Sequence, residues 1–155
     1  MLVLNSSDIA VMSDHAKKEF PDECCGVILG DPSDPSRNEV RPCANIQRQL
    51  KEQSPHLYTR DADTGYYMDP KDLKSAFDTA SAKGLEVVGF YHSHPNHNAY
   101  WSAEDHRASM WAGTDEPSFP DTSHVVISVN DGEVRDIAIF AWRPDIKKFV
   151  RENKP

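Results

Sequence analysis

The run Glu86-Val87-Val88-Gly89-Phe90-Tyr91-His92-Ser93-His94 is mostly apolar, rich in β-prone residues, and ends in two histidines. Such a composition is typical of a central strand, and Pro95 favours an exit from the sheet because it cannot donate to the next ladder position. Side chains alternate across a strand, so His92 and His94 point to the same face and can bind one ion. The stretch therefore predicts a central strand that carries part of a metal site.

Ser102 and Asp105 follow after a turn-prone connection. Three residues apart, they lie on one face of the first turn of a helix predicted from Ser102 to Ala112. Each pattern alone has an ordinary explanation, since Ser-x-x-Asp often caps a helix and an HxH pair is often polar packing. Together they predict two imidazoles and one carboxylate around an ion with an open fourth position, as in catalytic zinc sites.

The rest of the chain alternates between helical and strand patterns. Apolar residues recur at helical spacing from Ser7 to Phe20, with Ser7 or Asp8 as the expected cap. Asp69-Pro70 opens a second helix that ends at Gly84. Further strands are expected at residues 24–30, 39–46, 124–129 and 134–142, the last two joined by the turn Asn130-Asp131-Gly132. Residues 31–36 are expected to form a loop, and residues 47–66 fit neither pattern. This order predicts an α/β or α+β domain.

Length and composition limit the class of protein. A chain of 155 residues, 38% hydrophobic and 27% charged, is expected to form one soluble domain over residues 1–155. No apolar stretch approaches the roughly 20 residues that a membrane helix needs, and the start lacks the basic region of a signal peptide, so the cytoplasm is the expected location. The net charge of -8 disfavours nucleic acid as a partner.

His92-x-His94, seven residues, and then Ser102-x-x-Asp105 resembles the HxH-x7-SxxD signature of the JAMM/MPN metallopeptidases. Upstream, the segment from Pro21 to Gly30 resembles the one that carries this family's essential glutamate. The resemblance covers most of the chain. It implies a mixed, mostly antiparallel sheet flanked by helices, similar in outline to cytidine deaminases.

The resemblance also implies roles for individual residues. His92, His94 and Asp105 would bind one zinc ion per chain. Glu23, at the position of the essential glutamate, would act as general base and then as general acid. Ser102 would donate a hydrogen bond to the developing oxyanion.

The sequence also offers interpretations for residues close to the predicted site. Trp101 fits either stacking on a peptide substrate or simple packing, and His97 is a candidate substrate contact in the connection. His106 follows the carboxylate ligand directly, about 100° further around the helix, so it should face away from the metal. Cys24 and Cys25 should point to opposite sides of a strand, which predicts reduced core thiols.

The compact chain and the segment Pro-Asp-Glu-Cys-Cys-Gly-Val look most like stand-alone prokaryotic members that act on ubiquitin-like sulfur-carrier proteins. The resemblance implies hydrolysis of the bond after the carrier's C-terminal Gly-Gly tail, for example with release of cysteine. The alternatives are an isopeptidase for ubiquitin-type conjugates and a scaffold that binds partners without cleaving them. A non-haem iron oxygenase shares the ligand types but typically uses an all-β scaffold, and a nucleobase deaminase would need the motifs H-x-E and P-C-x-x-C, which are absent from the sequence. The oligomeric state is left open.

Overall fold

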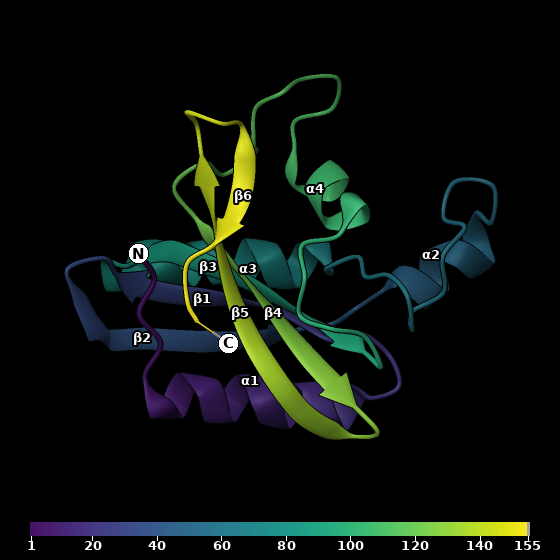
Figure 1. Cartoon of the computed structure of the whole chain (residues 1–155), viewed down its shortest axis with the longest axis horizontal. Coiled ribbons are helices and arrows are strands. Elements are labelled where there is room, and N and C mark those ends of the chain that lie inside the picture. The colour runs from purple at the N-terminus through teal and green to yellow at the C-terminus, as the bar shows by residue number, and fades with distance from the viewer. Residues whose placement is uncertain (155) are drawn as a thin grey trace.

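The histidine-bearing strand lies in the interior of a six-stranded sheet in the computed structural model, which describes residues 1–154 (Figure 1). The elements in chain order are α1 (Ser6–Glu19), β1 (Cys25–Asp31), β2 (Asp34–Cys43), α2 (Gln47–Gln53), α3 (Pro70–Lys83), β3 (Glu86–Pro95), α4 (Ala103–Ser109), β4 (Ser123–Asn130), β5 (Glu133–Arg143) and β6 (Lys148–Arg151). The strand order is β2-β1-β3-β4-β5-β6. Only β3 and β4 pair in parallel among the described residues, and the other neighbours are antiparallel. The predicted α+β architecture with a mixed, mostly antiparallel sheet is confirmed.

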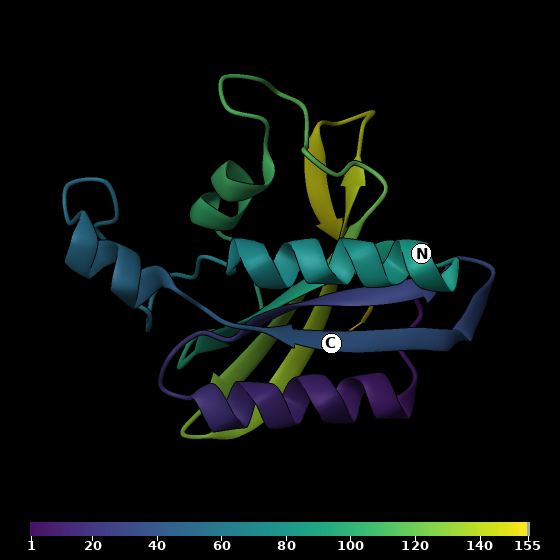
Figure 2. The same ribbon diagram turned by 180° about the vertical axis from the view of Figure 1, so that it is seen from behind.

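Helices cover both faces of the sheet, as Figures 1 and 2 show from opposite sides. On one face, α1 buries Met12 and Ala16 against side chains of β1, β3 and β4. On the other face, α3 buries Ala76 and Ala80 against β1 and β3, and an aromatic cluster that includes Phe149 of β6 packs beside β4 and β5. None of the helices among residues 1–154 combines the length and the apolar character needed to cross a bilayer.

The two long helices differ in how well their ends were predicted. The cap of α1 is Asn5 rather than Ser7 or Asp8, because the Asn5 side chain accepts from the Asp8 backbone N–H while the Asp8 carboxylate accepts from the Asn5 N–H, both at 2.9 Å. Asp8 is thus the third residue of a capping box. The ends of α3 match the prediction: the Asp69 side chain caps the first turn, and Gly84 ends the helix with a φ of 64°.

Several boundaries also differ. β2 covers residues 34–43 instead of 39–46, because the expected loop shortens to a turn at Pro32 and Ser33 and the chain then pairs directly with β1. Pro35 is tolerated there because β2 is an edge strand. α4 ends at Ser109 rather than Ala112, and both α2 and the short strand β6 were not predicted. The predicted hairpin between β4 and β5 is confirmed.

Candidate metal centre

His92 and His94 lie inside β3, between two neighbouring strands. His92 pairs with Cys25 of β1 on one side and with Val126 of β4 on the other. Cys25 and Val126 belong to the cores on the face covered by α3, so the two imidazoles point to that face as well. This interior position explains why both histidine side chains are buried.

Asp105, in the first turn of α4, reaches both imidazoles. The Nε2 atoms of His92 and His94 lie 3.1 Å apart, and the carboxylate oxygens of Asp105 lie 3.0 Å from the first and 3.3 Å from the second. Ligand atoms about 2.0–2.1 Å from one tetrahedral zinc ion are themselves about 3.4 Å apart. The three side chains therefore fit ligation of a single ion.

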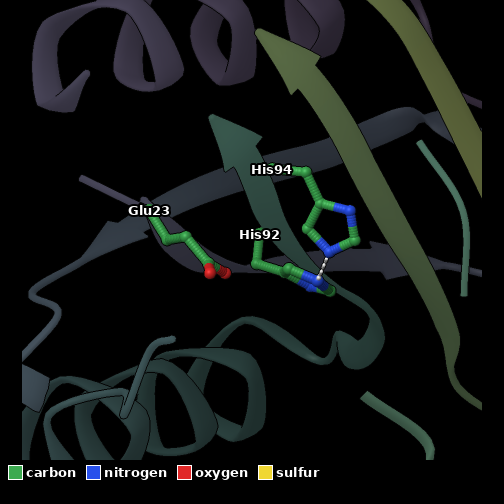
Figure 3. Close-up of side chains that lie close together, drawn as sticks. All are labelled: Glu23, His92 and His94. Atoms are coloured by element: carbon green, nitrogen blue, oxygen red, sulfur yellow. Dashed lines mark hydrogen bonds between the residues drawn. The ribbon is translucent and has the colours of Figure 1, made fainter. Parts of the chain in front are cut away.

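Glu23 completes the group from the segment that leads into β1. It precedes Cys25 by two residues, so its side chain points to the same face, and its carboxylate lies within 4.8 Å of ligand nitrogens of both histidines (Figure 3). Burial raises the pKa of Glu23 to about 8, the charge of His94 opposes this rise, and the charge of Asp105 adds to it. A carboxyl group in this position is close enough to the candidate ligands to exchange a proton with a molecule bound between them.

Both imidazole rings are held in place by groups outside the ligand set. The Nδ1 of His94 lies 3.0 Å from the carbonyl of Asn98, and since a carbonyl only accepts, this nitrogen carries the proton and Nε2 is left for a metal. The ring of His92 stacks on Tyr66, with ring centroids 4.7 Å apart and an interplanar angle of 25°. These contacts orient Nε2 of each ring toward the same point.

The carboxylate of Asp105 is oriented by the start of α4 itself. The Asp105 N–H donates to Ser102 Oγ at 3.0 Å, and the Ser102 N–H donates back to the carboxylate at 3.1 Å. Burial opposes ionisation of Asp105, but without a metal the charge of His92 and hydrogen bonds from the protonated imidazoles and from Ser102 hold the pKa of this carboxyl well below its usual range. The group is therefore an anion suited to a cation, and the same capping box that starts the helix sets its direction.

The centre opens into a cavity of about 420 Å³. Its lining includes Glu23, His94, Ser102 and Asp105, together with side chains from the loop between α2 and α3, among them Arg60. His97 also lines this cavity and is exposed. Of the candidate residues of the sequence analysis, His92 and Trp101 are absent from this lining, and His92 lies directly behind it, in contact with His94 and Asp105.

Trp101 lies in the aromatic cluster beside the site. Its ring centroid is 4.7 Å from that of Phe149 and 5.0 Å from that of His124, and it lines a smaller cavity of about 200 Å³. Of the two interpretations that the sequence left open, this placement favours packing. His106 turns toward Trp142 and Phe149, as its position after Asp105 predicted.

Sequence reasoning missed several residues that support the site. Tyr66 comes from the ambiguous segment, which has no periodicity from which its position could be inferred. Asn45 donates from its amide to the backbone carbonyls of Glu23 at 2.9 Å and Gly65 at 3.2 Å. Ser93, between the two histidines, accepts from the Cys24 N–H at 2.8 Å. A polar residue inside an apolar strand was the one available signal for Ser93.

The cysteines behave as predicted. Cys24 packs in the core under α1 and Cys25 in the core under α3, so the adjacent thiols lie on opposite faces of the sheet. Both are buried and free, as is Cys43. Burial raises the pKa of the Cys24 thiol to about 12, so it is not a thiolate near neutral pH.

Residues 6–144 match the family described as prokaryotic homologs of the JAB domain. This chain belongs to that family. JAB, or JAMM, proteins are metallopeptidases, and the buried group of Glu23, His92 and His94 is consistent with the metal site of such a protein.

The JAB-family chain is also similar to individual proteins. It is 30% identical to the CysO-cysteine peptidase of Mycobacterium tuberculosis over 131 residues, which cover 84% of this chain and 75% of that protein. It is 29% identical to the desampylase of Haloferax volcanii over 93 residues, 60% of this chain, and this match spans 58% of the length of the desampylase.

Two solved structures share the fold. The solution structure of protein DSY2949 from Desulfitobacterium hafniense has a TM-score of 0.71 at 24% identity, covering 98% of this chain and 90% of that one. The solution structure of a protein from Salinibacter ruber has a TM-score of 0.64 at 27% identity, covering 97% and 88%. The fold is therefore shared along nearly the whole chain.

Proposed function

We propose that this chain is a zinc-dependent peptidase that hydrolyses the amide bond after the C-terminal Gly-Gly tail of a ubiquitin-like sulfur-carrier protein and releases cysteine. The observation that carries the proposal is the convergence of the His92, His94 and Asp105 ligand atoms, 3.0–3.3 Å apart, beside the buried Glu23 carboxyl group. The similarity to a CysO-cysteine peptidase over 84% of the chain supports the substrate class.

The donor set favours one zinc ion per chain, held by His92, His94 and Asp105. Two imidazole nitrogens and a carboxylate oxygen, with one position left open, are the ligands of many catalytic zinc sites. A bound zinc ion would polarise the substrate carbonyl and lower the pKa of a water molecule to about 7.

The remaining steps belong to the protein. Water adds to the carbonyl carbon as Glu23 accepts a proton, and Glu23 donates that proton to the leaving nitrogen as the carbon–nitrogen bond breaks. Ser102 Oγ accepts from the Asp105 N–H, so its own hydrogen is available to donate to the substrate oxygen as negative charge develops there. The products are the carrier with a free C-terminal carboxylate and the released amino acid.

A second candidate is an isopeptidase that acts on ubiquitin-like conjugates, which the similarity to a desampylase favours. The same residues would act in the same order. The difference lies in the leaving group, which would be a lysine side-chain amine instead of an amino acid.

The substrate is tested by incubating the zinc-loaded protein with a sulfur-carrier protein that bears a C-terminal cysteine and measuring the carrier's mass. Loss of the cysteine residue alone is expected. An intact cysteine adduct beside a cleaved lysine isopeptide would replace the first candidate with the second.

Glu23→Gln separates metal binding from proton transfer. The variant should retain about one zinc per chain while turnover falls by about 10² to 10⁴, because the amide cannot carry the proton. Metal content by elemental analysis and the rate of adduct cleavage are the two measurements.

His92→Ala is the matched control, because it should lose the zinc together with the activity, two ligands seldom being enough to hold the ion firmly. Full turnover by Glu23→Gln, or a zinc-replete His92→Ala protein, would contradict the assigned roles.

A further inference from the structure

The cavity at the metal centre combines acidic side chains with one guanidinium group. Among the described residues, Arg60 is the only lysine or arginine in its lining, which also contains the carboxylates of Glu23, Asp63, Glu104 and Asp105. An anionic group of a substrate would be repelled by this surface unless it met a cation. The zinc ion of the proposed function would be occupied by the scissile carbonyl and the attacking water, so Arg60 marks where a separate anionic group of the substrate can be accepted.

Arg60 is free to accept such an anion. Most arginines of the chain form ion pairs, whereas Arg60 and Arg135 form none within residues 1–154. Nη1 of Arg60 donates to the carbonyl of Thr64 at 3.1 Å. A guanidinium group has five N–H donors, so most remain available for a ligand.

The loop that carries Arg60 is fastened to the segment that carries Glu23. The Glu23 N–H donates to the carbonyl of Ala62 at 2.8 Å, and the Gln47 side chain donates to the carbonyl of Arg60 at 2.9 Å. The stem of Arg60 also packs over Gly65, where a Cβ would lie only 3.2 Å from Arg60 Cβ. Arg60 and Glu23 thus belong to one wall of the cavity. Ser102 and α4, which come from a later part of the chain, form another.

In the proposed reaction, the α-carboxylate of the leaving amino acid would lie near the wall formed by Arg60 and Glu23. Glu23 delivers a proton to the leaving nitrogen, and in a released amino acid the α-carboxylate is two covalent bonds from that nitrogen. A lysine side-chain amine has no carboxylate at this distance. The planar fork of arginine matches the two oxygens of a carboxylate.

We propose that Arg60 binds the free α-carboxylate of the leaving amino acid and so selects C-terminal amino-acid adducts over lysine isopeptides. This inference rests on the proposed function and names the feature of the substrate that the cavity recognises. Arg60 is a substrate-binding residue in this role and takes no part in proton transfer.

The experiment compares two carrier substrates, one ending in Gly-Gly-Cys with a free carboxylate and one ending in Gly-Gly-cysteinamide, with a Gly-Gly-lysine isopeptide as a third. The wild-type protein should cleave the acid about tenfold or more faster than the amide in kcat/KM, as expected for a charge-assisted hydrogen bond. Arg60→Gln should lose this preference by slowing on the acid alone. Arg60→Lys should recover part of it, because it keeps the charge without the fork.

Arg135→Gln is the matched control, since Arg135 also forms no ion pair within residues 1–154 but does not line the cavity, and it should keep the wild-type preference. Equal rates on acid and amide, or a loss in Arg60→Gln that is the same for both, would overturn the role of Arg60 and leave the proposed peptidase in place. Cleavage of the isopeptide alone would overturn both.

Discussion

The hydroxyl group of Ser102 has two roles, since it caps α4 and is the proposed donor to the substrate oxyanion. It accepts from the Asp105 N–H at 3.0 Å, which starts α4 and orients a candidate ligand, and Ser102 also lines the cavity. A single substitution that removes the hydroxyl therefore mixes a loss of stability with a loss of rate. Two substitutions with different effects on the helix separate them.

We predict that Ser102→Ala and Ser102→Gly lose activity to a similar extent, about 10² to 10³ in kcat, if the hydroxyl stabilises the oxyanion. Their stabilities should differ, since alanine at an N-cap costs about 1 kcal/mol and glycine only a few tenths. Thermal unfolding of the zinc-loaded variants and kcat measure the two effects. Activity that recovers in the glycine variant would indicate that capping alone matters.

At the scale of elements, the pairing of β1 with β3 decides where Glu23 lies. Ser93 sits between the two histidines and points to the opposite face, where its hydroxyl accepts from the Cys24 N–H at 2.8 Å while its own N–H donates to the Cys24 carbonyl at 3.1 Å. Both backbone groups of Cys24, the residue next to Glu23, are thus hydrogen-bonded to the strand that carries the histidines. Ser93 is a positioning residue in this arrangement.

Ser93→Ala is expected to leave the buried Cys24 N–H without its acceptor and to lower the free energy of unfolding by about 1–3 kcal/mol. The zinc content should stay near one per chain, and kcat should fall roughly tenfold because the Glu23 carboxylate is less well placed. Metal analysis, denaturant unfolding and kinetics test this.

Ser93→Thr keeps the hydroxyl and should restore kcat more than it restores stability. A Ser93→Ala protein that is less stable but has wild-type kcat would limit Ser93 to a structural role.

For the molecule as a whole, the buried His124 makes the folding stability depend on pH. It is buried between Trp101, Phe90 and Phe149, and burial together with the charge of His92 lowers its pKa to about 3, with Asp105 opposing the shift. The unfolded chain binds a proton on this histidine below about pH 6.5, and the folded chain does not. The contribution of the neutral His124 to the free energy of unfolding is therefore fully present above pH 6.5 and is lost as the pH falls toward 3.

We predict that His124→Phe removes this dependence. Between pH 7 and 5 the wild-type protein should lose about 2 kcal/mol of unfolding free energy relative to the variant, from the shift of one titrating group. Denaturant unfolding with excess chelator measures the difference without a contribution from metal ligation. Unfolding free energies of the two proteins that run parallel from pH 7 to 5 would show that His124 takes up a proton in the folded protein as readily as in the unfolded chain.

Local patterns predicted more of the fold than of the site's surroundings. The spacing in β3 and α4, and the caps of α3, depend on residues two to four apart, whose directions a strand or helix sets. The predicted cap of α1, Ser7 or Asp8, was wrong. Asn5 and Asp8 are both residue types that cap helices, and they form the two ends of one capping box, so the residue types alone did not show which of them is the cap. Segment 47–66, without periodicity, offered no basis for placing Tyr66 or Arg60.

The family, the sheet with its helices, and the candidate ligands His92, His94 and Asp105 could be predicted from the amino-acid sequence, because the spacing of these residues follows from regular backbone geometry. The family resemblance named Glu23, but its distance from these ligands, the stacking of Tyr66 on His92 and the presence of Arg60 in the cavity follow from the tertiary structure alone. Tyr66 lies 26 residues from His92 along the chain, and Glu23 lies 69 residues from it. These contacts depend on strand order, on register and on hydrogen bonds between loops, none of which is encoded in a local pattern.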